Sequence, residues 1–178
     1  EDVKNIFSKK PNIRLLISSA LNSNLIETKT SYGIKLTQMQ DNADPQNHDI
    51  KIASNLEPCK SEEEDLIFAM KVAKHVKSNA IVLAKNKMTI GIGAGQMSRV
   101  ISTKIAFMKA KEEGLDVSGC VLASDAFFPF RDNIDLAAEN GAKHIIQPGG
   151  SIRDQEVIDA INENDMTMAV TGIRHFKH

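Results

Sequence analysis

Apolar positions along the chain fall into short runs that are separated by longer stretches with helical, amphipathic spacing. The short apolar or alternating runs predict β-strands, at residues 13–19, 32–39, 80–84, 88–92, 121–123, 143–147 and 167–170. The amphipathic stretches predict α-helices, one beginning at residue 61 and others at 98–113, 133–140 and 151–164. Strands that alternate with helices of about ten residues or more indicate an α/β layered domain with parallel strand pairs.

The pattern is less regular near the N-terminus than in the rest of the chain. Residues 40–49 are polar and contain a proline, which predicts a loop or the edge of a subdomain. We therefore expect a lead-in over residues 1–60 and the main α/β unit over residues 61–178. At the start of that unit we expect Ser61 to be a helix N-cap and Glu64 to complete a capping box.

Composition and charge exclude several classes of protein. The 178 residues include 22 Lys and Arg against 23 Asp and Glu. This balance argues against a protein whose net charge attracts nucleic acid or a membrane surface. Tryptophan is absent and Tyr32 is the only tyrosine, which disfavours a base-stacking surface. No apolar run is long enough to span a bilayer. Cys59 and Cys120 cannot form a disulfide framework, so we expect two buried thiols in a soluble, cytoplasmic protein.

Candidate chemistry lies at the predicted strand tips. In α/β layers, ligands gather where strands end, because backbone amides and helix N-termini face outward there. Four segments at such tips have unusual composition, namely 77–79, 91–99, 124–132 and 147–151. We expect these segments to converge on a shared pocket.

The glycine run of the second segment has two interpretations. Gly91, Gly93 and Gly95 follow a strand and precede a helix, which suits backbone amides that approach an anionic ligand. A dinucleotide site would need Gly or Ala where this chain has Ser98, and a carboxylate closer along the chain than Asp125. Tight packing alone explains the same glycines. A dinucleotide-binding α/β domain is therefore the alternative function.

The third segment gathers three of the seven phenylalanines, Phe127, Phe128 and Phe130, around Pro129. Pro129 prevents a continuous helix or central strand, so some of these rings must lie on a rigid loop. An aromatic loop with an adjacent carboxylate suits a flat, hydrogen-bonding heterocycle. A buried aromatic cluster explains the run equally well.

The last two features are a turn and the chain's tail. Gly149 and Gly150 form a turn that delivers Ser151 as a helix N-cap, which makes either an anion or carbonyl clamp or a plain turn. Arg174 and His178 in the tail either close over a site or lie in solvent. The chain lacks the paired cysteines of a zinc deaminase, so we expect no metal. It also lacks the G-x-S-x-G motif of a serine nucleophile.

Five ordered motifs resemble the bifunctional purine-biosynthesis (PurH) family. The match is to the C-terminal portion of its aminoimidazole-carboxamide ribonucleotide (AICAR) formyltransferase domain. The motifs are residues 77–82, 91–100, 123–132, 147–154 and 174–178. The similarity runs along the whole chain and is densest from Ser61 on. Because the chain begins with Glu1 rather than Met, we expect it to be part of a longer enzyme.

The resemblance implies a three-layer α/β/α fold that is cytidine-deaminase-like, with a mixed sheet and no zinc. It implies an enzyme, phosphoribosylaminoimidazolecarboxamide formyltransferase. This enzyme transfers a formyl group from the co-substrate 10-formyltetrahydrofolate to the 5-amino group of AICAR, which gives formyl-AICAR. It also implies IMP cyclohydrolase activity in the parent protein and a cytoplasmic homodimer that binds neither nucleic acid nor membrane.

The resemblance assigns nucleotide-binding roles to four residues. Asn79 matches a residue that hydrogen-bonds the carboxamide region, and Phe127 matches one that lines the nucleotide site. Arg174 matches a nucleotide-binding arginine, for which phosphate is the natural partner because a planar charged fork fits it best. Arg99 resembles a residue that reaches the nucleotide of a second subunit.

Four further residues match folate-binding positions. Val100 matches a wall of the folate site, and Asp132 matches the carboxylate that pairs with the pterin. Ser151 and Ile152 match the turn that contacts the folate.

The family's catalytic Lys-His pair lies upstream of Glu1 in the resemblance and is not in this chain. Two dipeptides have the same Lys-His sequence, Lys74-His75 and Lys143-His144. The first falls in a predicted helix and the second in a predicted strand, and we expect both to have structural roles. We therefore expect this chain to contain nucleotide- and folate-binding residues but no catalytic residue, with Asn79 in a supporting role. We expect no formyl transfer by this chain alone. A piece whose main activity is self-association is a third hypothesis.

Overall fold

The computed structural model describes residues 2–10, 12–16, 26–44 and 49–177. The chain forms two compact units, residues 1–42 and residues 43–178, and each is described by itself. Residues 13–16 of the predicted strand 13–19 have no regular structure, and the rest of that strand lies outside the described residues. His178 also lies outside them.

The first unit contains a short helix and a β-hairpin. Helix α1 spans Asp2–Phe7, and strand β1 (Ile26–Ser31) pairs antiparallel with β2 (Ile34–Met39). The single strand predicted over 32–39 is therefore wrong at its start. Tyr32 and Gly33 both have positive φ, 48° and 78°, and form the two-residue turn of the hairpin.

The second unit is built on a six-stranded mixed sheet of order β3-β8-β7-β6-β4-β5. Strands β6, β7 and β8 are parallel, whereas β4 runs antiparallel to both β5 and β6, and β3 runs antiparallel to β8. The strand bounds are β3 Lys51–Ile52, β4 Ile81–Lys85, β5 Met88–Gly93, β6 Cys120–Ser124, β7 Ala142–Gln147 and β8 Thr167–Val170.

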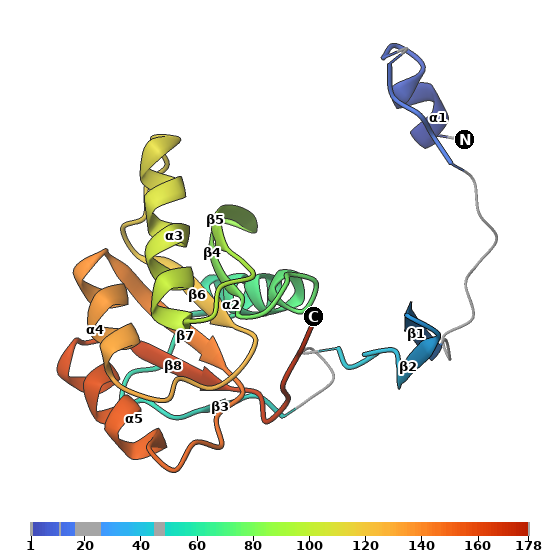
Figure 1. The fold of residues 1–178 in the computed structure, drawn as a ribbon. Helices are drawn as coiled ribbons and strands as arrows, with labels where there is room; N and C mark the ends of the chain where they lie inside the picture. Colours follow the sequence, from blue (N-terminus) through green and yellow to red (C-terminus); the bar gives the residue numbers. More distant parts are fainter. Residues whose placement is uncertain (1, 11, 17–25, 45–48, 178) are drawn as a thin grey trace. The chain divides into compact units, whose positions relative to one another are not determined.

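Helices cover both faces of this sheet. Helix α2 lies on one face, and α3, α4 and α5 lie side by side on the other (Figure 1). Their bounds are α2 Lys60–Ala73, α3 Arg99–Glu112, α4 Asp132–Glu139 and α5 Asp154–Glu163. The predicted three-layer α/β/α architecture with a mixed sheet is confirmed.

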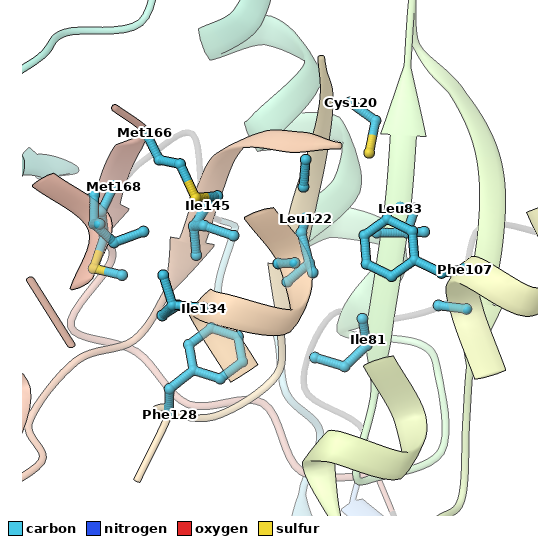
Figure 2. Close-up of a cluster of buried hydrophobic side chains, with 14 of the residues drawn as sticks. Ile81, Leu83, Phe107, Cys120, Leu122, Phe128, Ile134, Ile145, Met166 and Met168 are labelled. Atoms are coloured by element: carbon cyan, nitrogen blue, oxygen red, sulfur yellow. The ribbon is translucent and has the colours of Figure 1, made fainter. Parts of the chain in front are cut away.

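Alternation along the central strands supplies the apolar core on both faces. In β4, Ile81 and Leu83 face α3, α4 and α5, whereas Val82 faces α2. Figure 2 shows the first of these cores, where Phe107 from α3 and Ile134 from α4 meet the strand side chains. Strands covered on both faces must be apolar at every position, which explains their continuous apolar runs.

The start of α2 differs from the prediction by two residues. The N-cap is Cys59 rather than Ser61, and Glu62 accepts a hydrogen bond from the Cys59 backbone N–H at 2.6 Å. Glu64, expected in the capping box, instead pairs with Lys87 at 2.6 Å. The capping pattern therefore operates with the same spacing, but from the residue after Pro58.

The two cysteines also differ from the expectation of two buried thiols. Cys120 is buried in the sheet, and burial raises the pKa of its thiol to about 12. Cys59 is exposed because it is the N-cap of α2 rather than a residue of a buried strand.

Candidate functional site

The predicted strand-tip segments lie along one edge of the sheet. Ile81 at the start of β4 is paired with Gly93 at the end of β5 and with Ser124 at the end of β6. Strands β7 and β8 are parallel to β6, and Val170 at the end of β8 is paired with Lys51 at the start of β3. Segment 77–79 therefore reaches the same edge as the strand ends because β4 runs in the opposite direction. The segments thus share one edge of the sheet, and the expected pocket common to all four stays a prediction.

A buried carboxylate lies at the centre of this edge. Asp125, directly after β6, is fully buried and accepts a hydrogen bond from Arg99 Nη2 at 2.8 Å. Its other oxygen accepts one from the Ser78 hydroxyl at 2.5 Å. Arg99 Nε also donates to Ser124 Oγ at 2.8 Å, and the Arg99 side chain is only 11% exposed. Three segments distant in sequence are thus joined by one ion pair and its hydrogen bonds.

The C-terminal tail is attached to the same cluster. The backbone N–H of His175 donates to the Asp125 carbonyl at 3.0 Å, and the Ser78 N–H donates to the Lys177 carbonyl at 2.9 Å. Arg174, just before this attachment, places its guanidinium carbon 4.8 Å from the centroid of the Phe127 ring. A guanidinium at that distance over an aromatic face makes a cation–π contact, so Arg174 and Phe127 form one surface.

Asn79 is half-buried at the start of β4, next to Ser78. Its side-chain amide nitrogen donates to the Gln96 carbonyl at 2.9 Å, and its backbone carbonyl accepts a hydrogen bond from Ser102 Oγ at 2.8 Å. These contacts fix the side chain against the loop that follows β5. The amide oxygen of Asn79 is the acceptor that this arrangement offers to a ligand.

A cleft of about 550 Å³ opens beside Arg174. It is lined by the ends of β7 and β8 and by the start of β3, and its charged lining residues are Asp49, Lys51 and Arg174. This volume is in the range of small-molecule sites. The cleft and the Arg174–Phe127 surface share the guanidinium of Arg174.

The backbone amides of the glycine turn beside the cleft are engaged by a side chain of the chain itself. The backbone N–H groups of Gly150 and Ser151 donate to the Asp154 carboxylate at 2.7 and 3.1 Å. The N-cap of α5 is Arg153 rather than Ser151, whose hydroxyl accepts the Arg153 N–H at 3.1 Å. Because the chain's own carboxylate occupies these amides, an anion would have to displace it to bind there.

Close packing explains two of the three glycines of the run, Gly91 and Gly93 in β5. A Cβ on Gly93 would lie 1.8 Å from the Ser102 backbone oxygen, and one on Gly91 would lie 2.2 Å from that of Ala106. The two glycines thus let α3 pack directly on β5. Strand β5 is also an edge strand in an antiparallel hairpin with β4, whereas a dinucleotide fingerprint belongs to a parallel βαβ unit.

The aromatic loop divides its rings between the core and the surface. Phe128 is fully buried, and its N–H donates to the Gln147 side-chain oxygen at 2.8 Å. Phe127 lies beneath Arg174, and Phe130, which is 46% exposed, lies beneath the guanidinium of Arg153 at 4.8 Å. One ring therefore anchors the loop in the core and two rings face outward.

Comparison with known families decides the affiliation of the chain. The sequence profile of the AICARFT/IMPCHase bienzyme matches residues 1–109. The chain belongs to this family. Enzymes of the family act in purine biosynthesis, and the match confirms the resemblance at the level of the family; the assignment to its formyltransferase domain stays a prediction. The matched residues include Asn79, Arg99 and Val100 and end inside α3.

One solved structure is similar to part of the chain. It is the crystal structure of a diaminohydroxyphosphoribosylaminopyrimidine deaminase/5-amino-6-(5-phosphoribosylamino)uracil reductase from Thermotoga maritima, with 17% sequence identity and a TM-score of 0.39. The match covers 61% of this chain and 34% of that chain. The chain thus spans about a third of that protein's length.

The folate residues predicted from the AICARFT/IMPCHase resemblance lie apart from the Asp125 cluster. Asp132 is exposed as the first residue of α4, and Ile152 is 105% exposed before α5. Val100 is half-buried in the first turn of α3, directly after Arg99. Among the hydrogen bonds of the described residues, none joins Asp132, Ser151 or Ile152 to Asp125.

The two Lys-His dipeptides occupy structural positions. Lys74 caps the end of α2, and its ammonium donates to the Ala43 carbonyl at 2.7 Å. His144 in β7 shares a hydrogen bond with Thr167 Oγ1 at 2.9 Å and lies 3.3 Å from Glu62. Burial lowers the pKa of His144 below its ordinary value. In the described residues, no three His, Cys, Asp or Glu side chains are grouped for a metal ion.

Sequence reasoning misses the residues that connect the site. Ser78 stands out only as a member of a longer segment, and Asp125 is considered only as the carboxylate of a dinucleotide site. The Ser124-Asp125 pair at the end of the apolar run of β6 is nevertheless a signal of buried polar chemistry. Gln96, which holds Asn79, has no pattern of its own. No described helix is long and apolar enough to cross a membrane.

Proposed function

We propose that this chain provides the AICAR and 10-formyltetrahydrofolate binding surfaces for formyl transfer, rather than for the cyclohydrolase reaction of the family. The observation that carries the proposal is the cluster at the sheet edge. Asn79, Arg99, Phe127 and Arg174 come from four separate segments, yet all lie around Asp125 or beside the cleft next to Arg174.

The geometry suits a planar nucleotide that carries an anionic group. The Phe127 ring and the Arg174 guanidinium over it together offer a surface to a flat ring, and Arg174 also offers charged N–H donors at the edge of the cleft. The Asn79 amide oxygen can accept an N–H from the amine or the carboxamide of AICAR. These groups would hold the ring, the phosphate and the reacting amine in a fixed relation.

Positioning matters here because the AICAR amine is a weak nucleophile. Its lone pair is delocalised into the ring and the carboxamide, so reaction requires that the amine be oriented toward the formyl carbon and lose a proton. The leaving folate nitrogen must gain a proton. The chain's contribution in this proposal is orientation, while the proton transfers fall to the family's Lys-His pair, which this chain does not contain.

On the folate side, the proposal uses Asp132, Val100, Ser151 and Ile152. An exposed carboxylate at the start of α4 can accept paired N–H groups from a pterin. Ile152 and Val100 supply apolar surface that a pterin or its linked ring can cover. The proposal keeps a cytoplasmic homodimer, in which Arg99 reaches a second subunit's nucleotide. Such a role would require Arg99 to leave or share its ion pair with Asp125.

Calorimetric titration of the chain with AICAR tests the proposal. We expect saturable binding that weakens about tenfold in Arg174→Ala, the loss that follows when a charge-assisted hydrogen bond of roughly 1.5–3 kcal/mol is removed. Lys109→Ala, an exposed substitution on α3 away from the cleft, should bind as the unchanged chain does. No binding of AICAR, or equal affinity in Arg174→Ala, would contradict the proposal.

A turnover assay separates binding from catalysis. Supplied with AICAR and 10-formyltetrahydrofolate, the purified chain should give no formyl-AICAR above the rate of a blank. Measurable turnover would show that the proton transfers do not need the Lys-His pair.

A further inference from the structure

Asp125 is a fully buried carboxylate to which no ligand contact has been assigned. Burying a carboxylate is costly unless it is paired and hydrogen-bonded. Both of its oxygens are engaged, one by Arg99 Nη2 at 2.8 Å and the other by the Ser78 hydroxyl. The group is therefore fully satisfied by two segments other than its own.

The backbone of Asp125 holds a third segment. Its carbonyl accepts the His175 N–H at 3.0 Å. Ser78 holds the same segment two residues later, because its hydroxyl accepts the Lys177 N–H at 3.2 Å and its own N–H donates to the Lys177 carbonyl. Residues 175–177 are thus fixed at both ends, immediately after Arg174.

The predicted nucleotide residues share a simple relation to this centre. Each one either bonds to Asp125 or lies within two positions of Asp125 or of a residue that bonds to it. They are Asn79, Arg99, Phe127 and Arg174. Of the folate residues, Val100 shares this relation because it follows Arg99, whereas Asp132, Ser151 and Ile152 do not among the described hydrogen bonds.

We propose that Asp125 is the positioning residue for the nucleotide. This inference rests on the proposed function. The carboxylate sets the direction of Arg99, and together with Ser78 it holds the tail so that Arg174 stays over Phe127. Asp125 itself is too deeply buried to touch a ligand, so it acts through these neighbours.

The chemistry of the centre requires a carboxylate rather than a group of similar shape. An asparagine side chain has one acceptor oxygen and one donor nitrogen. Arg99 and Ser78 donate to opposite oxygens of Asp125, so the amide nitrogen would face one of these two donors. The neutral amide also cannot neutralise a guanidinium that is only 11% exposed. Asp125→Asn therefore changes the directions of Arg99 and the tail with little change in volume.

Titration of the full chain with two ligands tests the inference. In Asp125→Asn we expect the affinity for AICAR to fall about tenfold or more, and the affinity for 10-formyltetrahydrofolate to stay within about twofold. A role in stability alone would weaken both ligands together, so the split between them is the diagnostic readout. Asp116→Asn removes an exposed ion pair with Lys85 and should leave both affinities unchanged.

A second variant covers the case in which Asp125→Asn does not fold. Ser78→Ala removes the hydrogen bonds to Asp125 and to Lys177 without leaving a charge unpaired. We expect it to lower the AICAR affinity by about threefold or more, again without change for the folate.

The outcomes separate the two proposals. If the unchanged chain fails to bind AICAR, the proposed function fails. If the unchanged chain binds AICAR and both variants bind it equally well, or lose both ligands to the same extent, the inference about Asp125 is overturned.

Discussion

The nucleotide side and the folate side of the candidate site are held in different ways. On the nucleotide side, a buried ion pair and the C-terminal tail join segments that are distant in sequence. On the folate side, Asp132 and Ile152 lie exposed at the starts of two helices, where their own neighbours fix them. Substitutions should therefore couple stability to binding on the first side and change binding alone on the second.

The largest effect should come from Gly93, where α3 meets the nucleotide side. In Gly93→Ala the new Cβ would lie 1.8 Å from the Ser102 backbone oxygen, so α3 must move and carry Arg99 with it. We expect a loss of about 3 kcal/mol in the free energy of unfolding, measured by urea denaturation, together with weaker AICAR binding.

Gly114 supplies the control for this substitution. Its φ is +66°, but a Cβ added at this position would have open space within 4 Å, so Gly114→Ala meets backbone strain without a collision. It should cost roughly 1 kcal/mol and leave AICAR binding unchanged. Equal losses at the two glycines would remove close packing as the reason for Gly93.

A smaller and more selective effect should come from Asp132 on the folate side. In Asp132→Asn we expect the affinity for 10-formyltetrahydrofolate to fall about tenfold, because an amide cannot accept paired N–H groups from the pterin. The free energy of unfolding should stay within about 0.5 kcal/mol, as for other exposed positions. Calorimetry and urea denaturation measure the two quantities, and a large loss of stability would contradict the contrast between the sides.

The smallest effect should come from His144, which lies outside both sides. Burial lowers its pKa in the folded chain, whereas the unfolded chain keeps the ordinary value of 6.5. Above that value neither state binds the proton and the stability is fully present. As the pH falls below it, the unfolded state gains the proton first and stability is lost.

The measurement is the free energy of unfolding at pH 7 and at pH 5.5. We expect a larger drop in the unchanged chain than in His144→Gln, which keeps a hydrogen-bonding partner for Thr167. His75→Gln, an exposed histidine, should follow the unchanged chain. A drop in His144→Gln as large as in the unchanged chain would assign the pH dependence to other groups.

The sequence predicts the elements of the second unit well because its strands are covered on both faces. Continuous apolar runs such as 80–84 are typical of strands buried on both faces, and their shortness favours a strand over a helix. Strand β1 of the first unit escapes the same reasoning because it has one apolar residue, Ile26, and all of its residues are exposed. Strand β2 is also exposed at every residue, but its alternation of apolar and polar residues predicts it apart from the start of the strand.

The location of the candidate site can be predicted from the sequence, but the hydrogen bonds that hold it together cannot. Strand-tip reasoning places the four segments together, since the direction of each strand follows from its connections. The hydrogen bonds between Asp125, Ser78 and the tail depend on which side chains meet in space, and no local pattern encodes that. The helix N-caps at Cys59 and Arg153 are displaced from the predicted serines for the same reason, because carboxylates nearby decide which amides are satisfied.

A crystal structure of the chain with AICAR bound tests the central claim most directly. The account predicts the AICAR ring against Phe127, its phosphate within hydrogen-bonding distance of Arg174, and an N–H of the ligand on Asn79, with the Arg99–Asp125 pair intact beneath. AICAR bound elsewhere on the chain, with these residues untouched, would contradict it.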